Sequence, residues 1–466
     1  MDIKSLYKVY KQHPCITTDS RDCPQGSIFL ALKGANFDGN RFAAGALEKG
    51  CALAIVDDEA YAVEGDGRYI LVDDALDTYQ QLAREHRRRF QIPVVGITGT
   101  NGKTTTKELV SAILQTSYNV LYTEGNLNND IGVPKTLFRL RRDHQVAVVE
   151  MGASHPGDIR RLVHTAEPTC ALITNVGRAH LQGFGSIEGV EKTKGELYDF
   201  IAEQADHEWT WKEMNITDSY QTVVNADDAT LCRMAKERGL LMPVSYSQDT
   251  ADESANICGE LISCDPFLKF RWRQNDEPEQ WYEVQSHLVG AYNLNNMLAA
   301  IAVGDLLLVE PRDICRALES YVPSNSRSQL TVTEHNRLVV DAYNANPTSM
   351  MAALENFSLM GGEKKMLILG QMGELGSDSD AEHDKVAAYI CQQGWRDVWL
   401  VGDSFAKSAE RLSAQDAAAA DTMRHWQLMA TADEVKEAIA RHRPEGYTIL
   451  IKGSNSNKLY ELPPLL

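Results

Sequence analysis

The sequence has few of the features that mark secreted, metal-binding or membrane proteins. Its nine cysteines are scattered without any Cys-x-x-Cys pair, so neither a disulfide framework nor a zinc site is indicated. No apolar run approaches the ~20 residues that a membrane-spanning helix needs, and the N-terminus has no apolar signal core. These absences predict a cytoplasmic protein with buried free thiols and no membrane span.

Positive charge is also scarce. The 466 residues include 46 Lys and Arg against 65 Asp and Glu, which gives a formal net charge of -19. Nonspecific binding to nucleic acid or to an anionic membrane needs a basic surface, so no nucleic-acid partner is expected. An anionic ligand would have to be bound by a local arrangement of donors.

One such arrangement is a glycine-rich turn that follows an apolar run and precedes a predicted helix over 105–114. Glycines let backbone N–H groups approach phosphate oxygens, and the N-terminus of a helix adds positive partial charge. Lys103 would carry a full charge to the outer phosphates, and the Thr104 hydroxyl would bind Mg²⁺. The strict P-loop pattern has glycine where this chain has Ile97, so the turn is a variant, and an ordinary glycine turn is the alternative. The run is Gly96-Ile97-Thr98-Gly99-Thr100-Asn101-Gly102-Lys103-Thr104-Thr105.

A chain of this length predicts two to four domains, and we expect three, all of α/β class. The first is a small unit over 1–90, which ends in a basic amphipathic connector helix over 79–90. The central unit spans 91–322 and the C-terminal unit 323–466. Strand and helix alternate through the central unit, which predicts a parallel sheet flanked by helices. Its predicted strands are 94–98, 120–123, 146–151, 171–175 and 222–225, with an antiparallel edge at 268–272 and a helix at 297–308.

The C-terminal unit is predicted to follow a linker or hinge over 323–328. A polar segment over 203–220, which contains Trp209 and Trp211, has the character of an insertion without an assigned function. The strands predicted for the C-terminal unit are 338–341, 366–369, 398–401 and 448–451, and its predicted helices are 349–357, 381–392 and 434–441.

Several polar side chains come where predicted strands of the central sheet end. Ligands of open parallel sheets bind beyond the carboxyl ends of the strands, so Glu150 would face the phosphates and suit Mg²⁺. His180 follows the next strand and would lie on the same edge. Lys192 and Lys194 come shortly after, and carbamylation by CO₂ would turn one of them into a carboxylate-like metal ligand. Solvated side chains remain the alternative for Glu150 and for both lysines.

The residues over 98–105 resemble the phosphate loop of the Mur ligase family, whose relatives include folylpolyglutamate synthase-type enzymes. The Asn-Leu-Asn-Asn and Tyr-Asn-Ala-Asn-Pro portions of further segments are similar to members that join D-alanyl-D-alanine to a UDP-N-acetylmuramoyl tripeptide. The resemblance spans all three units and implies a P-loop-type central sheet and a Rossmann-like C-terminal domain. The further segments are 125–134 (GNLNNDIGVP), 150–153 (EMGA), 174–180 (TNVGRAH) and 341–347 (DAYNANP).

The resemblance implies ATP and two Mg²⁺ ions as cofactors. Thr104 and Glu150 would hold one ion, and His180 with a carbamylated Lys194 would hold the other, with Lys192 as the rival for that modification. Lys103, Glu150, His180 and Lys194 would be the catalytic residues. The implied ATP contacts, with Asn293 and Asn296 near the adenine, are Gly99, Thr100, Asn101, Gly102, Lys103, Thr104, Thr105, Asn293, Asn296, Arg327 and Asp341.

The resemblance also implies where the other substrates bind. Ser20, Arg21 and Asp38 match the grip of the first domain on the UDP-sugar. A group from the central unit would face the muramoyl-peptide end, and two asparagines of the C-terminal unit would contact the incoming dipeptide. The group is Asn126, Asn128, Asn129 and Ser154, and the two asparagines are Asn344 and Asn346.

The implied reaction is ATP-driven amide formation through an acyl phosphate in peptidoglycan precursor synthesis, by a monomer. Another ligase of the family, or a folylpolyglutamate synthase-like enzyme, would share the ATP chemistry. A nucleotide-binding switch without ligase activity is the alternative of a different class. One departure is Asn455, which stands where a basic residue is frequent in the family, so no ligand role is assigned to the segment that begins at Lys452.

Overall fold

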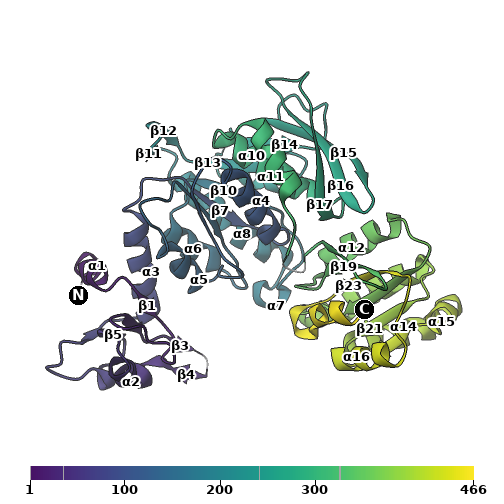
Figure 1. The fold of residues 1–466 in the computed structure, drawn as a ribbon, viewed down its shortest axis with the longest axis horizontal. Coiled ribbons are helices and arrows are strands. Elements are labelled where there is room, and N and C mark those ends of the chain that lie inside the picture. Colours follow the sequence, from purple (N-terminus) through teal and green to yellow (C-terminus); the bar gives the residue numbers. More distant parts are fainter. Residues whose placement is uncertain (1, 35, 241, 325–326) are drawn as a thin grey trace.

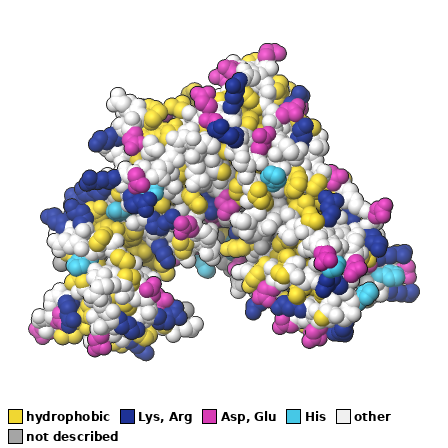
Figure 2. Space-filling view, viewed as in Figure 1, with side chains coloured by type: hydrophobic (Ala, Val, Ile, Leu, Met, Phe, Trp, Pro, Cys, Tyr) yellow, Lys and Arg dark blue, Asp and Glu magenta, His cyan; other side chains and the backbone are white. Residues whose placement is uncertain are grey.

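The computed structural model of the chain contains three α/β units, each with its own largely parallel sheet, which confirms the predicted fold class (Figure 1). It describes residues 2–34, 36–240, 242–324 and 327–466. The N-terminal and C-terminal units extend from the same side of the central unit, and Figure 2 shows an open hollow between them. Among the described residues, no helix combines the length and apolar composition that a membrane crossing requires.

The N-terminal unit is built on a four-stranded parallel sheet with the strand order β1-β2-β5-β6. The buried strand residues of this sheet pack against α1 and α3 on one side and α2 on the other. Its elements are α1 (Ile3–Gln12), β1 (Ile16–Thr17), β2 (Ile28–Leu30), β3 (Lys33–Gly34), β4 (Phe37–Asp38), η1 (Gly39–Phe42), α2 (Ala43–Glu48), β5 (Leu53–Val56), η2 (Glu59–Tyr61), β6 (Tyr69–Leu71) and α3 (Ala75–Arg87).

Helix α3 is the predicted connector, but it begins and ends earlier than 79–90. It begins at Ala75 because the Asp74 side chain caps it by accepting from Asp77 N. At its other end the buried Arg87 guanidinium donates to the carbonyl oxygens of Ala166 and Glu167, at 3.0 and 3.1 Å. Arg87 therefore supplies donors to the carbonyl groups at the end of α6, where the last turn of a helix leaves such groups without partners inside the helix, and it fixes the connector on the central unit.

The central unit has a nine-stranded sheet with the order β17-β16-β15-β14-β13-β10-β7-β9-β8. The pairs from β8 to β15 are parallel, and β15, β16 and β17 pair antiparallel, which confirms the predicted antiparallel edge. All five predicted parallel strands form, with ends shifted by at most one or two residues. The elements are β7 (Val94–Thr98), α4 (Lys103–Leu114), β8 (Val120–Tyr122), α5 (Gly132–Leu137), β9 (Val146–Glu150), α6 (Asp158–Ala166), β10 (Cys170–Ile173), α7 (Leu181–Phe184), α8 (Ile187–Glu203), β11 (Glu208–Trp211), β12 (Ile216–Ser219), β13 (Gln221–Asn225), α9 (Ala229–Glu237), β14 (Val244–Ser247), β15 (Ile257–Cys264), β16 (Phe267–Gln274), β17 (Tyr282–Val289), α10 (Asn293–Leu306) and α11 (Pro311–Ser320).

The polar segment over 203–220 is an integral part of the central unit. It forms an antiparallel hairpin of β11 and β12 after the end of α8. Trp211 is buried in the core, with its ring 5.1 Å from that of Tyr118. The hairpin thus covers one margin of the core, because a buried tryptophan contributes a large apolar surface.

The C-terminal unit has a six-stranded sheet with the order β18-β19-β23-β20-β21-β22, parallel except for the edge strand β18. All four predicted strands and three predicted helices form. Of the predicted linker over 323–328, residues 325–326 lie outside the described part of the chain. The elements are β18 (Gln329–Val332), β19 (Arg337–Asp341), α12 (Pro347–Leu359), β20 (Lys365–Gly370), η3 (Gly376–Asp378), α13 (Ser379–Gln392), β21 (Val398–Val401), α14 (Asp403–Gln415), α15 (Ala417–Met423), β22 (Gln427–Met429), α16 (Ala432–Arg441), β23 (Thr448–Lys452), η4 (Asn455–Asn457), η5 (Leu459–Glu461) and η6 (Pro463–Leu465).

The contacts of Arg87 give a stability prediction with a neighbouring control. Arg87→Ala should lower the free energy of unfolding by about 2–4 kcal/mol, because buried carbonyl groups lose their donors. Arg88 makes an exposed ion pair with Glu167, so Arg88→Ala should cost less than about 1 kcal/mol. Urea unfolding of the full chain followed by circular dichroism measures both. Equal losses in the two variants would contradict the role given to Arg87.

Candidate active site

The glycine-rich turn lies between the end of β7 and the start of α4. Gly99 and Gly102 have φ angles of +145° and +80°, which favour glycine. A Cβ on Gly99 would lie 2.0 Å from Thr174 Oγ1, and one on Gly102 would lie 2.4 Å from Asn296 Oδ1. No side chain caps α4, so backbone N–H groups of its first turn are free to bind an anion.

The turn is held in place by the end of the neighbouring strand β10. Thr100 N donates to Asn175 O at 2.9 Å, and Asn101 N donates to Asn175 Oδ1 at 3.0 Å. In return, Thr174 Oγ1 donates to Asn101 O at 2.5 Å. These bonds fix the turn before any ligand binds, which lowers the entropy cost of binding.

Lys103 is the first residue of α4 and folds back over the turn. Its Nζ donates to Gly99 O at 2.8 Å and to Thr100 O at 3.0 Å. Removal of the ammonium group from water lowers the pKa of Lys103 to about 8, against the opposing effect of Glu150. A phosphate oxygen at this position would favour the charged amine and raise that pKa.

Glu150 ends β9, on the other side of β7, and is fully buried. Its Oε1 accepts from Thr104 Oγ1 at 3.2 Å and from Asn128 Nδ2 at 2.8 Å. Its Oε2 is buried and has no hydrogen-bond partner among the described residues. An orphaned carboxylate oxygen beside a hydroxyl suits a hard cation, and Mg²⁺ is commonly held by one or two carboxylates together with substrate phosphates. The donor set therefore fits the ion that the sequence predicts.

His180 follows β10 and lines the same cavity as the turn. Its Nδ1 is in contact with the carboxylate of Glu374, which belongs to the C-terminal unit. Burial lowers the pKa of His180 in spite of that carboxylate, so the neutral imidazole is favoured. A neutral imidazole nitrogen can serve as a metal ligand.

Lys194 lies on α8, where it is buried and does not line the cavity. Its Nζ is 5.7 Å from the centre of the Phe184 ring, and that ring centre is 6.2 Å from the imidazole of His180. Burial, and next the charge of Lys103, lower the pKa of Lys194 well below its ordinary value. Lys192 is exposed on the same helix, so Lys194 is the lysine whose neutral amine is favoured. An uncharged amine is the form that reacts with CO₂, and the buried position therefore fits a carbamate.

Asn293 and Asn296 lie in the first turn of α10, which begins four residues before the predicted 297. Asn296 Nδ2 donates to Asn293 Oδ1 at 2.8 Å, and Asn296 Oδ1 accepts from Thr106 Oγ1 at 3.1 Å. Both asparagines line the cavity, with Asn296 directly against the Gly102 backbone. They form the wall of the cavity behind the turn.

The C-terminal unit supplies the opposite wall. Asp341 ends β19 and pairs at 2.5 Å with the buried Lys452, which is the last residue of β23, and both residues line the cavity. The guanidinium carbon of Arg327 lies 3.8 Å from the centre of the Tyr343 ring. This wall of the cavity is therefore built from the ends of the adjacent parallel strands β19 and β23 and from the residues near them.

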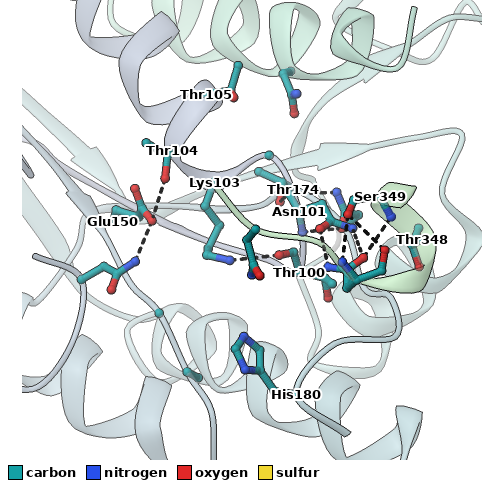
Figure 3. A pocket seen from close by; sticks show the side chains of 18 of the residues that line it. Thr100, Asn101, Lys103, Thr104, Thr105, Glu150, Thr174, His180, Thr348 and Ser349 are labelled. Atoms are coloured by element: carbon teal, nitrogen blue, oxygen red, sulfur yellow. Dashed lines mark hydrogen bonds between the residues drawn. The ribbon is translucent and has the colours of Figure 1, made fainter. Parts of the chain in front are cut away.

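Asn346 joins the two units directly at the turn. Its Nδ2 donates to Asn101 Oδ1 at 2.7 Å, and Asn101 Nδ2 donates to Asn346 Oδ1 at 3.4 Å. The same Oδ1 accepts from Ser349 N at 2.9 Å and so caps α12. Figure 3 shows Asn101 and Ser349 close together beside Thr348. Asn344 is exposed and lines the cavity, and it makes no hydrogen bond to the central unit among the residues that the structure describes.

The cavity has a volume of about 810 Å³ and is lined from both units. Six predicted residues do not line it: Gly99, Lys194 and Asn126, together with Ser20, Arg21 and Asp38 of the N-terminal unit. The predicted residues that do line it are Thr100, Asn101, Gly102, Lys103, Thr104, Thr105, Asn128, Asn129, Glu150, Ser154, His180, Asn293, Asn296, Arg327, Asp341, Asn344 and Asn346.

Of the three N-terminal residues, Ser20 and Arg21 follow β1, and Asp38 ends β4 and caps η1. Arg21 pairs with Asp19 at 2.8 Å, and both side chains are exposed. Asp38 Oδ1 accepts from the buried Asn40 at 2.8 Å, and Asn40 also donates to Asp57. The carboxyl end of β1 is where an open parallel sheet binds ligands, separate from the cavity of the central unit.

Sequence reasoning missed several residues that shape the site. Thr174 and Asn175 belong to a segment that was singled out, but their hydrogen bonds to the turn depend on β10 lying beside β7. Tyr343 and Lys452 belong to motifs of the sequence, but those motifs assign them no role. Glu374 had no sequence signal, because its contact with His180 crosses between units.

Comparison with known proteins agrees with this architecture. Residues 14–87 match the Mur ligase family catalytic domain, residues 97–304 the Mur ligase middle domain, and residues 326–455 the Mur ligase glutamate ligase domain. The chain is 32% identical over 449 residues to the UDP-N-acetylmuramoyl-tripeptide–D-alanyl-D-alanine ligase of Bacillus subtilis, covering 96% of this chain and 92% of that protein. The enzyme of the same name from Escherichia coli is also 32% identical over 449 residues, with the same coverage.

Solved structures show the same fold. A crystal structure of MurF from Acinetobacter baumannii superposes with a TM-score of 0.80 at 30% identity, covering 96% of this chain and 92% of that one. MurF from Thermotoga maritima, solved in complex with ADP, has a TM-score of 0.78 at 24% identity and covers 97% of both chains. Since the matched domains and relatives span nearly the whole sequence, the chain belongs to the Mur ligase family.

Proposed function

We propose that this ligase joins D-alanyl-D-alanine to a UDP-N-acetylmuramoyl tripeptide at the expense of ATP. The observation that carries the proposal is the single cavity in which the glycine-rich turn, Glu150 and His180 meet the C-terminal unit. Relatives with that printed activity, 32% identical over nearly the whole chain, favour this pair of substrates. The reaction belongs to peptidoglycan precursor synthesis, and we place it in the cytoplasm, where ATP is supplied.

The turn and the first turn of α4 would bind the triphosphate, with Lys103 at the outer phosphates. Thr104 and Glu150 would hold one Mg²⁺, while His180 and a carbamylated Lys194 would hold a second. Magnesium at these positions would neutralise charge that develops on the transferred phosphoryl group. Lys103 adds its own charge there, which is the main contribution that a protein makes to phosphoryl transfer.

A carboxylate is a poor acyl donor, so the tripeptide must be activated. Its terminal carboxylate oxygen attacks the γ-phosphorus of ATP, a new O–P bond forms, and the bond to the β-phosphate oxygen breaks to release ADP. The neutral amine of the dipeptide then attacks the acyl carbon. The C–N bond forms, the amine loses its proton, and the C–O bond breaks to release inorganic phosphate.

The other substrate contacts follow from position. Ser20, Arg21 and Asp38 would bind the UDP-sugar at the edge of the N-terminal sheet, across the hollow seen in Figure 2. Asn344 is exposed in the cavity and suits the incoming dipeptide, whereas Asn346 is already bonded to Asn101 and would contact the dipeptide only after exchanging that bond.

Toward the muramoyl-peptide end, Asn128, Asn129 and Ser154 line the cavity, and Asn126 lies just outside it. Closure of the C-terminal unit over this region would exclude water from the acyl phosphate. The proposal also assigns one function to each unit: residues 1–90 bind the UDP-sugar, residues 91–322 bind ATP, and residues 323–466 bind the incoming dipeptide.

A second candidate is a family ligase that adds a single amino acid. The match of residues 326–455 to a domain named for glutamate ligation favours it. The two candidates share the ATP chemistry and differ in the nucleophile, so they are separable by substrate.

Phosphate release measured over a substrate panel tests the function. With ATP and Mg²⁺ present, release should require both a UDP-N-acetylmuramoyl tripeptide and D-alanyl-D-alanine, because the acyl phosphate forms on one and is consumed by the other. Single amino acids and the UDP-dipeptide precursor serve as controls. Phosphate release with glutamate in place of the dipeptide would support the second candidate. Phosphate release in the absence of both the UDP-linked peptide and an amine substrate would exclude both candidates.

The burial of Lys194 predicts a chemical rescue. Lys194→Ala should lose activity by more than about a hundredfold, since a metal ligand is removed, and short carboxylates such as formate or acetate should restore part of it. Lys192→Ala, on the exposed face of the same helix, should retain near-normal rates. Rescue of Lys192→Ala by these acids, with none for Lys194→Ala, would move the carbamate to Lys192.

A further inference from the structure

A second cavity lies at the joint between the N-terminal and central units, where α1 packs beside α3 (Figure 1). This joint cavity is lined mainly by residues of α1 and by the segment 138–144 of the central unit. Its volume of about 550 Å³ is in the range of sites that bind small molecules, which occur preferentially where domains meet. Among the described residues, none lines both this cavity and that of the glycine-rich turn.

One wall of the joint cavity is a fixed aromatic cluster. The ring of Tyr10 lies 5.0 Å from that of Phe138 and 5.5 Å from that of His86. His86 Nε2 donates to Leu140 O at 3.2 Å, and His86 Nδ1 accepts from the Tyr7 hydroxyl at 3.0 Å. Burial lowers the pKa of His86, which favours this neutral ring. Tyr7 and His86 therefore hold the units together, and the cluster offers a ligand its apolar ring surfaces.

Two other donors of the lining are buried and unused. Tyr10 and His144 are only 4% and 8% exposed. Arg141 N donates to His144 Nδ1 at 3.0 Å, so the ring proton of His144 is on Nε2. Within the described part of the chain, neither that Nε2–H nor the Tyr10 hydroxyl has a hydrogen-bond partner. Buried donors normally have one, so we expect an occupant of the cavity to supply the acceptors.

The joint cavity is basic, although the chain has a formal net charge of -19. Lys11, Arg139 and Arg141 line it, and none of its described lining residues is acidic. Lys11 is exposed and forms no ion pair with any residue that the structure describes. Arg139 pairs with Glu124 at 2.6 Å. Arg141 pairs with Asp143 at 3.3 Å. Both acids are more than half exposed, and because such pairs contribute little stability, an anion can compete for the arginines.

We propose that the joint cavity binds a small aromatic carboxylate, with the anionic group at Tyr10, His144 and Lys11 and the ring against Phe138. Hydrogen bonds from these donors to an ionised oxygen are of the strong, charge-assisted kind. Contact between the ligand ring and Phe138 adds the attraction of paired aromatic rings. A ligand bound there touches α1 and the segment 138–144, and so bridges the N-terminal and central units. The site does not depend on the proposed ligase activity.

The test is the binding of 2-naphthoate to the full chain, measured by isothermal titration calorimetry. Two comparison molecules separate the parts of the ligand: 2-naphthalenemethanol keeps the rings without the charge, and acetate keeps the charge without the rings. The titration is repeated with ADP and UMP in excess, because a probe bound at a nucleotide site would be displaced by them.

Three variants each remove one donor. Tyr10→Phe keeps the ring and loses the hydroxyl. His144→Asn keeps an acceptor for Arg141 N and loses the Nε2–H, and Lys11→Met keeps the length of the side chain and loses its charge. The matched control is Lys8→Met, since Lys8 is exposed on the same helix and does not line the cavity. Circular dichroism checks that each variant is folded.

We expect the wild-type chain to bind 2-naphthoate with a Kd of about 1 mM or tighter, and both comparison molecules at least about tenfold more weakly. Tyr10→Phe and His144→Asn should each weaken binding about fivefold or more, Lys11→Met about threefold, and Lys8→Met less than about twofold. Tyr10→Phe and Lys11→Met decide the matter if His144→Asn does not fold.

Four results would overturn the proposal. These are no binding of 2-naphthoate, equal binding of the uncharged alcohol, displacement of 2-naphthoate by ADP or UMP, and unchanged affinity in the donor variants. Equal binding of the alcohol would show an adventitious apolar contact only.

Discussion

The central constraint on the active site is that an acidic chain has to bind a polyanion. Local backbone N–H donors have to supply that binding. With a formal net charge of -19, the surface as a whole cannot attract a triphosphate. The turn after β7 solves this locally, because glycine conformations and the uncapped start of α4 leave N–H groups facing the cavity. The strand order puts β9 and β10 on either side of β7, so the acid of one strand and the anchors of the other meet at the turn.

The cavity is a joint product of two units, and that division suits the chemistry. The central unit contributes the turn, Glu150 and His180, whereas Asn346, Asp341 and their neighbours come from the C-terminal unit. An acyl phosphate must be protected from water, and a cavity with walls from two units shields its contents on both sides. The Asn101–Asn346 pair and the His180–Glu374 contact join the two units beside the glycine-rich turn.

Five parallel strands of the central sheet and four strands of the C-terminal sheet were predicted to within two residues, because apolar runs such as 146–149 are typical of strands buried on both faces. The sequence analysis did not predict β14, β15, β17, β18 or β22. It did indicate the strand-end positions of Glu150 and His180, since parallel strands end at one edge. Ends of helices were less predictable: α3 starts at Ala75 because of the Asp74 cap, a local bond that periodicity does not reveal. Contacts between units, including those of Arg87, Lys452 and Glu374, depend on tertiary docking that no local pattern encodes. The roles assigned to individual site residues stay predictions.

The central claim is that Glu150 holds a metal ion against the phosphates bound by the turn. The most direct measurement is the Mg²⁺ dependence of ADP affinity in the wild-type chain and in Glu150→Gln, which keeps the size of the side chain and an oxygen for Asn128. The account predicts that Mg²⁺ tightens ADP binding to the wild-type chain at least about tenfold and has little effect on the variant. An equal response to Mg²⁺ in the two proteins would contradict it.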